Sequence, residues 1–330
     1  MDRRTFLVSV AGVVLAPPLP AAAQVTGKVY RIGYLGQGSK ADGLADNGAL
    51  GMLLRNLRAL GYVEGTNLTI ESRFADGRTD VLAALAEQLV QAKPDVITVP
   101  SAGLAEIIVE RTSTIPVVAL NAGQLQAEPN VRSLARPGGN LTGMQIFSPE
   151  TTGKRLQLLQ ELVPGVRRVA VLRGVPFAGP GFDLYRDATM AVATRLGIRV
   201  RFVQFESIDD LNRLFDEMAR EKDQALLVWG NPHLNLHRKA IFDLTIRHRL
   251  PAVYDVRGYP PDLMVYAAKV DEVAREAATY VDRILKGAYP GDLPIGQARS
   301  FELVINLQTA KALGLTIPPS LLARADEVIQ

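Results

Sequence analysis

The fold of this 330-residue chain is decided by the stretch Arg31-Ile32-Gly33-Tyr34-Leu35-Gly36-Gln37-Gly38-Ser39. A largely apolar run gives way to small and polar residues, which predicts a buried strand that ends in a loop. The same design returns in Arg168-Val169-Ala170-Val171-Leu172-Arg173-Gly174. Each copy opens a series in which predicted strands alternate with predicted helices. We therefore expect two similar α/β lobes, with the function in the crevice between their strand ends.

The two copies continue in parallel, which favours an internal structural repeat. In each copy a predicted helix ends at a Leu-Gly pair, Leu60-Gly61 and Leu196-Gly197, where glycine supplies the left-handed cap. The next predicted strands, 67–74 and 199–205, also correspond. Strands that alternate with helices in this way predict parallel sheets covered by helices on both faces.

Capping residues and helix breakers set the bounds of the expected helices. Residues 36–48 are rich in Gly, Asp, Ser and Asn, so we expect a long loop there. Asp80, Ser101 and Ser207 are each expected to cap the helix that follows. Pro232 is expected to open a helix that runs to about residue 249.

Three extended stretches are suited to carry the chain between the lobes. They lie near residues 144–147, 263–267 and 297–305. We expect an N-terminal lobe of residues 28–144 plus 268–297 and a C-terminal lobe of 145–267 plus 298–330. Three crossings form a hinge that allows closure around a ligand.

The composition narrows the chemistry that the chain can perform. It has no cysteine, which excludes disulfides, zinc–thiolate and iron–sulfur sites and a cysteine nucleophile. The net charge of +3 comes from interspersed charges without a basic block, so we expect no nucleic-acid partner. We also expect a monomer, because the protein must open and close around its ligand and dock on a partner.

Residues 1–23 have the parts of a cleavable signal peptide. Arg3-Arg4 precedes the short apolar run 6–15, and Ala21-Ala22-Ala23 supplies an A-x-A cleavage site. The run is too short to span a membrane. Arg3-Arg4 also fits the twin-arginine motif, so Sec and twin-arginine export both stay open. No cysteine follows the run, and we expect a periplasmic protein that is not a lipoprotein.

Catalytic and cofactor motifs are weak. Residues 36–41 match the dinucleotide pattern G-x-G-x-x-A, but Asp42-Gly43 is expected to postpone the helix that the pattern requires, and no acidic residue ends the second strand. His233 and His237 are four apart, without the glutamate of H-E-x-x-H, which favours a solvated helix face over a metal site. We expect no enzyme, cofactor or metal; a Rossmann-like enzyme that uses the loop Gly36–Ser39 is the alternative.

Four spaced motifs characterise the chain after the signal peptide. The longest is the ending 301–329, which includes Phe301-Glu302-Leu303-Val304-Ile305-Asn306 and Thr316-Ile317-Pro318-Pro319-Ser320. The others are Leu60-Gly61-Tyr62-Val63-Glu64-Gly65-Thr66-Asn67, Ser133-Leu134-Ala135-Arg136-Pro137-Gly138-Gly139-Asn140-Leu141-Thr142-Gly143, and Lys154-Arg155-Leu156 with Leu162-Val163-Pro164-Gly165. Together they closely resemble the motifs of the ABC transporter substrate-binding proteins of the tryptophan/tyrosine-binding type.

The resemblance covers essentially the whole chain after the signal peptide. It implies a type I periplasmic-binding-protein fold, with two Rossmann-like lobes and a three-strand hinge. It also implies capture of a small organic molecule for ABC permease subunits in the inner membrane. An amino acid is implied as the ligand, with aromatic ones favoured. A receptor subunit for a membrane sensor is the alternative with the same binding step.

This chain departs from the family pattern near the expected ligand. Arg173-Gly174-Val175-Pro176 stands where the family usually has Asn-Pro, and Gly230-Asn231-Pro232 stands where an aspartate between two prolines is common. The segment 257–262 is shorter than the usual loop. These departures fall where ligand identity is decided.

Ligands of open α/β sheets bind outside the carboxyl ends of the strands. Ser101 opens a helix whose N–H groups suit a carboxylate, although a plain N-cap is the alternative. Asp255 suits an ammonium group, and Phe177 or Tyr254 suits stacking; for Arg173 and Asp255 the alternative is a surface pair. The candidate ligand-binding residues are Gly36, Gln37, Ser39, Ser101, Ala102, Asn121 and Ala122 in the first lobe, and Arg173, Phe177, Asn231, Tyr254 and Asp255 in the second.

Overall fold

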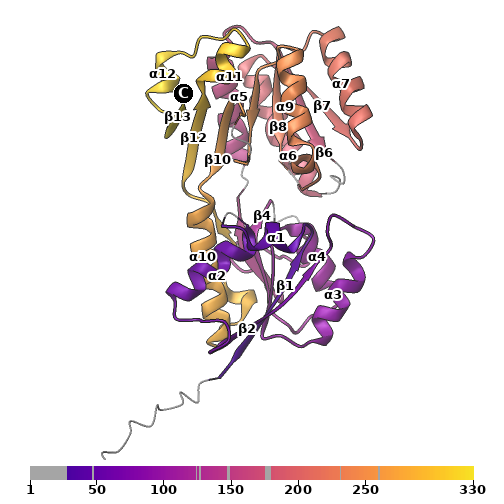
Figure 1. The fold of residues 1–330 in the computed structure, drawn as a ribbon, viewed down its shortest axis with the longest axis vertical. Coiled ribbons are helices and arrows are strands. Elements are labelled where there is room, and N and C mark those ends of the chain that lie inside the picture. Colours follow the sequence, from indigo (N-terminus) through magenta and orange to yellow (C-terminus); the bar gives the residue numbers. More distant parts are fainter. Residues whose placement is uncertain are drawn as a thin grey trace, which may run out of the picture.

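The computed structural model describes residues 28–46, 48–123, 125, 128–146, 149–174, 180–230, 232–258 and 261–330. These residues form two α/β units, each built on one sheet, which lie one above the other in Figure 1. The predicted signal peptide lies outside the described residues. None of the helices within the described ranges has both the length and the hydropathy to cross a bilayer.

Sheet A has six strands in the order β11-β5-β4-β3-β1-β2, and every pair in it is parallel. β3 and β5 are buried along their whole length, as expected for strands covered on both faces. The strands are β1 (Tyr30–Gly36), β2 (Leu68–Phe74), β3 (Val96–Val99), β4 (Val117–Ala122), β5 (Leu141–Gln145) and β11 (Gly296–Gln297).

Helices cover both faces of sheet A. On one face α2 (Ala49–Ala59) and α10 (Val270–Leu285) share an apolar core with the strands. On the other face α3 (Leu82–Gln91) and α4 (Ala102–Val109) form a second core. Complete burial of a leucine such as Leu53 or Leu89 contributes about 1.5–3 kcal/mol, which is why the apolar stripes fix the helices to the sheet.

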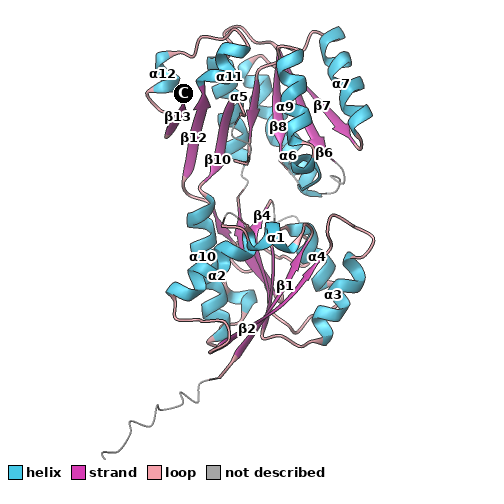
Figure 2. Ribbon diagram, viewed as in Figure 1, coloured by secondary structure: helices cyan, strands magenta, loops and turns pink. Residues whose placement is uncertain are grey.

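Sheet B has seven strands in the order β13-β12-β10-β9-β8-β6-β7 (Figure 2). One face is covered by α5 (Pro149–Leu162), α6 (Pro180–Leu196), α11 (Leu307–Ala312) and α12 (Pro319–Leu322), and the other by α7 (Ile208–Arg220), α8 (Pro232–Leu236) and α9 (Arg238–Arg247). The strands are β6 (Arg168–Gly174), β7 (Arg199–Phe205), β8 (Ala225–Trp229), β9 (Ala252–Tyr254), β10 (Met264–Ala268), β12 (Phe301–Asn306) and β13 (Glu327–Ile329).

The two sheets repeat one topology. β1 lies between β2 and β3 in sheet A, and β6 lies between β7 and β8 in sheet B. The glycines that follow α2 and α6, Gly61 and Gly197, have φ of +92° and +67°, so both occupy the left-handed cap that their Leu-Gly pairs predict. The predicted pair of α/β lobes is confirmed.

The chain passes between the sheets three times. It leaves sheet A after β5, returns from β10 to α10, and crosses again from β11 to β12. β12 is antiparallel to β10, unlike the predicted all-parallel arrangement, because the returning strand must run opposite to the one that left. The stacked rings of Tyr266 and Phe301, with centroids 5.6 Å apart, join these two strands near the crossings.

Four local expectations differ from the structure. The loop 36–48 contains a short helix, α1 (Lys40–Leu44), because Ser39 caps it. Asp80 does not cap α3, since its carboxylate pairs with Arg78, 3.0 Å away. The helix expected over 232–249 breaks at His237, which separates α8 from α9. The strand β13, which pairs with β12, was not expected.

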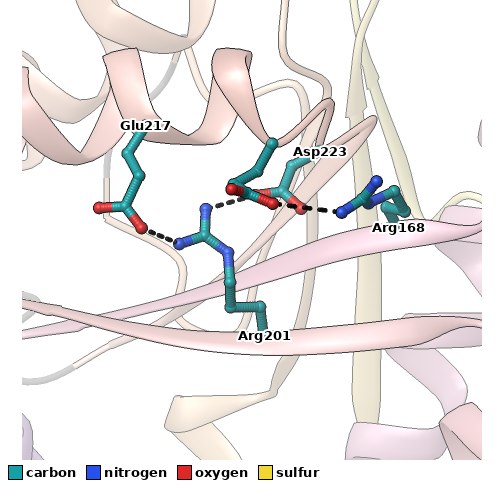
Figure 3. A network of polar contacts seen from close by, with 5 residues as sticks. Arg168, Arg201, Glu217 and Asp223 are labelled. Atoms are coloured by element: carbon teal, nitrogen blue, oxygen red, sulfur yellow. Dashed lines mark hydrogen bonds and ion pairs between the residues drawn. The ribbon is translucent and has the colours of Figure 1, made fainter.

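A polar network fastens α7 to the edge strand of sheet B (Figure 3). Arg201 on β7 contacts Glu217 at 2.6 Å and Asp223 at 2.7 Å. Arg168, the first residue of β6, pairs with Glu221 at 3.3 Å. This network lies at the amino end of β6, the opposite end from the predicted ligand site, so we assign it a structural role.

Candidate functional site

The carboxyl ends of the parallel strands gather most of the candidate residues. In sheet A, β1, β3 and β4 end at or beside Gly36, Ser101 and Ala122. In sheet B, β6 and β9 end beside Arg173 and Asp255. Figure 1 shows β4 and α1 at the end of one unit that faces β6 and α6 of the other. Phe177 and Asn231 lie outside the described residues.

The glycine loop after β1 is shaped by packing against one aromatic ring. A Cβ atom added at Gly36 would lie 2.8 Å from Cδ1 of Phe74, which ends β2. Gln37 and Gly38 accept main-chain hydrogen bonds from Gly77 and Asp76. A helix does start inside the G-x-G-x-x-A pattern, contrary to the expectation, but it is only five residues long. The Phe74 ring thus explains the glycine at position 36 without a phosphate.

Both candidate serines of sheet A cap helices. The Ser39 hydroxyl accepts a hydrogen bond from the Asp42 N–H at 3.1 Å and donates one to the Asp42 carboxylate at 2.6 Å. The Ser101 hydroxyl accepts from the Leu104 N–H at 3.4 Å, at the start of α4. Ala102 is the first residue of α4. The main-chain N–H groups here, rather than the serine hydroxyls, are the groups suited to an anion.

Two amide side chains lie at the ends of neighbouring strands of sheet A. Asn121 is the second-last residue of β4, and Gln145, the last of β5, pairs with Ala122. Among the described residues, Oδ1 of Asn121 and Oε1 of Gln145 are buried without a hydrogen-bond partner. Buried acceptors of this kind suit a ligand N–H group. Gln145 was not predicted, because its stretch was interpreted only as an interlobe crossing.

Arg173 provides a cation at the carboxyl end of β6. Its guanidinium lies over the ring of Phe182 on α6, with Cζ 3.8 Å from the ring centroid. Partial burial lowers the pKa of this guanidinium from its usual value, and it stays charged at neutral pH. The side chain is thus held in a defined position, which suits recognition of a carboxylate.

Asp255 is a buried carboxylate, which contradicts the alternative of a surface pair. It is 3% exposed, and its Oδ1 accepts a hydrogen bond from the Gly230 N–H at 2.6 Å. Burial raises the pKa of Asp255, whereas the positive charges of Arg155 and Arg238 lower it. Asp255 is therefore part of a charge cluster inside the unit, next to the connection that follows β8.

The partners of Asp255 were not predicted from the sequence. Arg155 on α5 is fully buried; its Nε donates to the Tyr266 main-chain oxygen at 2.9 Å. Arg238 on α9 pairs with Asp262. Burial raises the pKa of Asp262 to about 6, opposed by Arg238. Arginines on helices gave no local signal, because their burial depends on which strand the helix covers.

Tyr254 lies in the core of the sheet-B unit. Its side chain is 1% exposed, and its ring lies under the guanidinium of Arg238, 4.9 Å from Cζ to the centroid. In this conformation the ring is closed to a stacking ligand, since Arg238 and the core cover it.

The candidate residues provide an arginine and a buried carboxylate in sheet B, and amide acceptors and a helix start in sheet A. Groups of these kinds are chemically suited to the carboxylate and the ammonium group of a small zwitterion. Within the described ranges, the structure has no group of three or more His, Cys, Asp or Glu side chains placed to hold a metal ion.

Comparison with known proteins gives consistent results. The sequence model of the family described as ABC transporter substrate binding protein matches residues 46–329. The chain is 20% identical over 264 residues to a protein named tyrosine-binding protein from Clostridioides difficile, covering 79% of this chain and 75% of that protein.

Solved structures share the fold. A conserved domain protein from Vibrio cholerae is 24% identical, with a TM-score of 0.83, covering 91% of this chain and 100% of that one. A structure from Streptococcus pneumoniae described as an ABC domain in complex with L-Trp is 21% identical, with a TM-score of 0.80, covering 91% and 99%. A ligand-free, open substrate-binding protein from Clostridium difficile is 19% identical, with a TM-score of 0.69, covering 92% and 100%.

Proposed function

Because the chain belongs to the family of ABC transporter substrate-binding proteins, we propose that it captures an amino acid, with aromatic ones favoured, and delivers it to an ABC importer. The observation that supports the proposal is that the strand ends of the two sheets face each other. Sheet A and sheet B turn the carboxyl ends of their parallel strands towards one another, and both ends carry polar residues.

The charged side chains at these strand ends suit the carboxylate and the ammonium group of an amino acid. Arg173 is proposed to bind the carboxylate, together with main-chain N–H groups at the start of α4. Asp255 is proposed to attract the ammonium group, and the amide oxygens of Asn121 and Gln145 to accept hydrogen bonds from it. Aromatic specificity is supported by the tyrosine-binding relative and the L-Trp complex. Phe177 is the proposed stacking residue.

Ligand capture is proposed to stabilise a closed form. Contacts from both lobes favour closure, whereas contacts from one lobe give binding without it. We propose lobes of residues 28–144 plus 268–297 and 145–267 plus 298–330. The closed monomer then docks on permease subunits of the inner membrane, after export to the periplasm through the signal peptide 1–23.

A thermal-shift experiment on the chain from Gln24 onward tests the proposal. A ligand that binds only the folded state stabilises it by about 2.7 kcal/mol at a hundredfold excess over its Kd. We expect a shift with L-Trp or L-Tyr and none with NAD or NADP. A shift with the nicotinamide cofactors alone would support an enzyme and contradict the proposal.

Arg173→Ala tests the role of the cation. Losing a charge-assisted hydrogen bond of about 1.5–3 kcal/mol weakens binding roughly 10- to 100-fold. Arg168→Ala is the matched control, because Arg168 lies at the other end of β6. Titration calorimetry should find weaker binding only for Arg173→Ala. Equal affinities for both variants would remove Arg173 from the site.

A further inference from the structure

Two histidines that the proposed function does not use lie at the carboxyl end of sheet B. His233 is on α8, and His237 lies between α8 and α9. Both rings pack against Phe205, the last residue of β7, with centroid distances of 5.1 and 5.7 Å. The sequence favoured a solvated helix face for this pair, whereas Phe205 holds the two imidazoles together at a strand end.

The two imidazole rings are spaced as two ligands of one metal ion would be. Their centroids are 5.0 Å apart, and their planes are inclined by 65°. Two imidazoles on a tetrahedral ion, with metal–nitrogen bonds of about 2.0–2.1 Å, have centroids roughly 5 Å apart. The spacing is thus suitable for chelation without a large movement of the main chain.

The hydrogen bonding of His233 leaves one nitrogen for a ligand. Within the part of the chain that the structure describes, its Nε2 is buried without a hydrogen-bond partner. Imidazole nitrogens with a free lone pair are the commonest protein ligands of transition-metal ions, so this nitrogen is the one suited to a metal.

We propose that His233 and His237 form a two-histidine site for a transition-metal ion of the Cu²⁺, Ni²⁺ or Zn²⁺ class. Imidazole ligands favour these ions over Mg²⁺ and Ca²⁺, which prefer oxygen. Since no third protein ligand stands beside the pair among the described residues, water or donor atoms of a solute complete the coordination.

The test uses Cu²⁺ alone, because Cu²⁺ binds nitrogen ligands most tightly in this series. Titration calorimetry in a non-coordinating buffer measures stoichiometry and Kd for the exported chain and for His233→Gln and His237→Gln. His248→Gln is the matched control, because His248 is the third and last histidine and also packs against a phenylalanine, Phe215, at 5.6 Å. Thermal unfolding of each variant identifies any that fail to fold.

We expect one Cu²⁺ per chain, with binding weakened about tenfold or more by either substitution at the pair and unchanged in His248→Gln. Electron paramagnetic resonance should detect two nitrogen ligands in the wild type and one in folded His237→Gln. Absence of binding, equal binding by all variants, or equal loss in His248→Gln would overturn the site. The Cu²⁺ titration contains no amino acid, so a negative result would not bear on the proposed capture of amino acids, which is tested separately.

Discussion

Replacing Asp255 by alanine is expected to destabilise the unit built on sheet B, as well as to weaken ligand binding. The carboxylate is 3% exposed and accepts the Gly230 N–H at 2.6 Å. It also provides negative charge near the buried guanidinium groups of Arg155 and Arg238. Alanine removes all of these interactions at once.

The expected magnitude follows from two overlapping costs. A buried N–H without an acceptor costs about 1–3 kcal/mol. Removing one partner of a buried charge cluster costs about 3–5 kcal/mol, because the remaining charges lose their compensation. The two costs share the same desolvation, so we expect a total of about 3–5 kcal/mol. For a unit of this size that lowers Tm by roughly 10 °C.

Urea denaturation followed by circular dichroism measures this change. Asp255→Asn keeps an acceptor for Gly230 while removing the charge, so it should lose less stability than alanine. Asp216→Ala is the surface control, because the Asp216 side chain is 70% exposed. The double variant Asp255→Leu/Arg155→Met should be more stable than Asp255→Leu alone, because it removes a buried charge together with its partner.

A loss below about 1 kcal/mol for Asp255→Ala, similar to the surface control, would refute this reasoning. It would mean that water reaches the cluster, or that Arg155 and Arg238 are compensated without Asp255. The Asn variant is therefore the proper test of ligand binding, because the Ala variant confounds affinity with folding.

Two further predictions concern other sites. Gly143→Ala should lower the free energy of unfolding, measured by urea denaturation, by about 3 kcal/mol or more. Gly143 has φ of +143°, and an added Cβ would lie 2.7 Å from the Ala119 main-chain nitrogen. The control is Gly103→Ala on α4, which has no atom within 4 Å of an added Cβ and should be neutral or stabilising. Burial and the nearby Glu106 raise the pKa of Glu128 to about 7, so wild-type stability should fall as pH rises from about 4.5 to 7. In Glu128→Gln this fall in the free energy of unfolding should be smaller by about 1–2 kcal/mol, a value reduced for the partial exposure of the side chain. Equal pH profiles of stability for the wild type and the variant would contradict the prediction.

Much of the fold was predictable because its signals are local. Gly61 and Gly197 cap helices through their own φ angles, and Ser101 and Ser207 cap through hydrogen bonds that span three residues. Apolar runs such as 168–174 specify buried parallel strands for the same reason. The order in which strands and helices alternate then restricts the chain to a few topologies.

Local signals did not extend to every element. The helix expected over 232–249 breaks at His237, and α1 forms in a stretch whose composition predicted a loop. β13 exists because β12 offers it a partner, so its three residues carried no independent signal. β13 and the break at His237 depend on which neighbour packs against the segment, whereas α1 depends on its Ser39 cap.

The sequence by itself determined the two α/β units, their internal repeat and the strand ends at which a ligand is expected, because periodicity and capping act over a few residues. The tertiary structure alone decided which charges meet there. Arg155 lies 100 positions before Asp255, and its charge acts on that carboxylate only because α5 packs on sheet B. His233 and His237 became a pair against Phe205 in the same way. Burial and electrostatic compensation are properties of such long-range contacts, and no short stretch of sequence contains them.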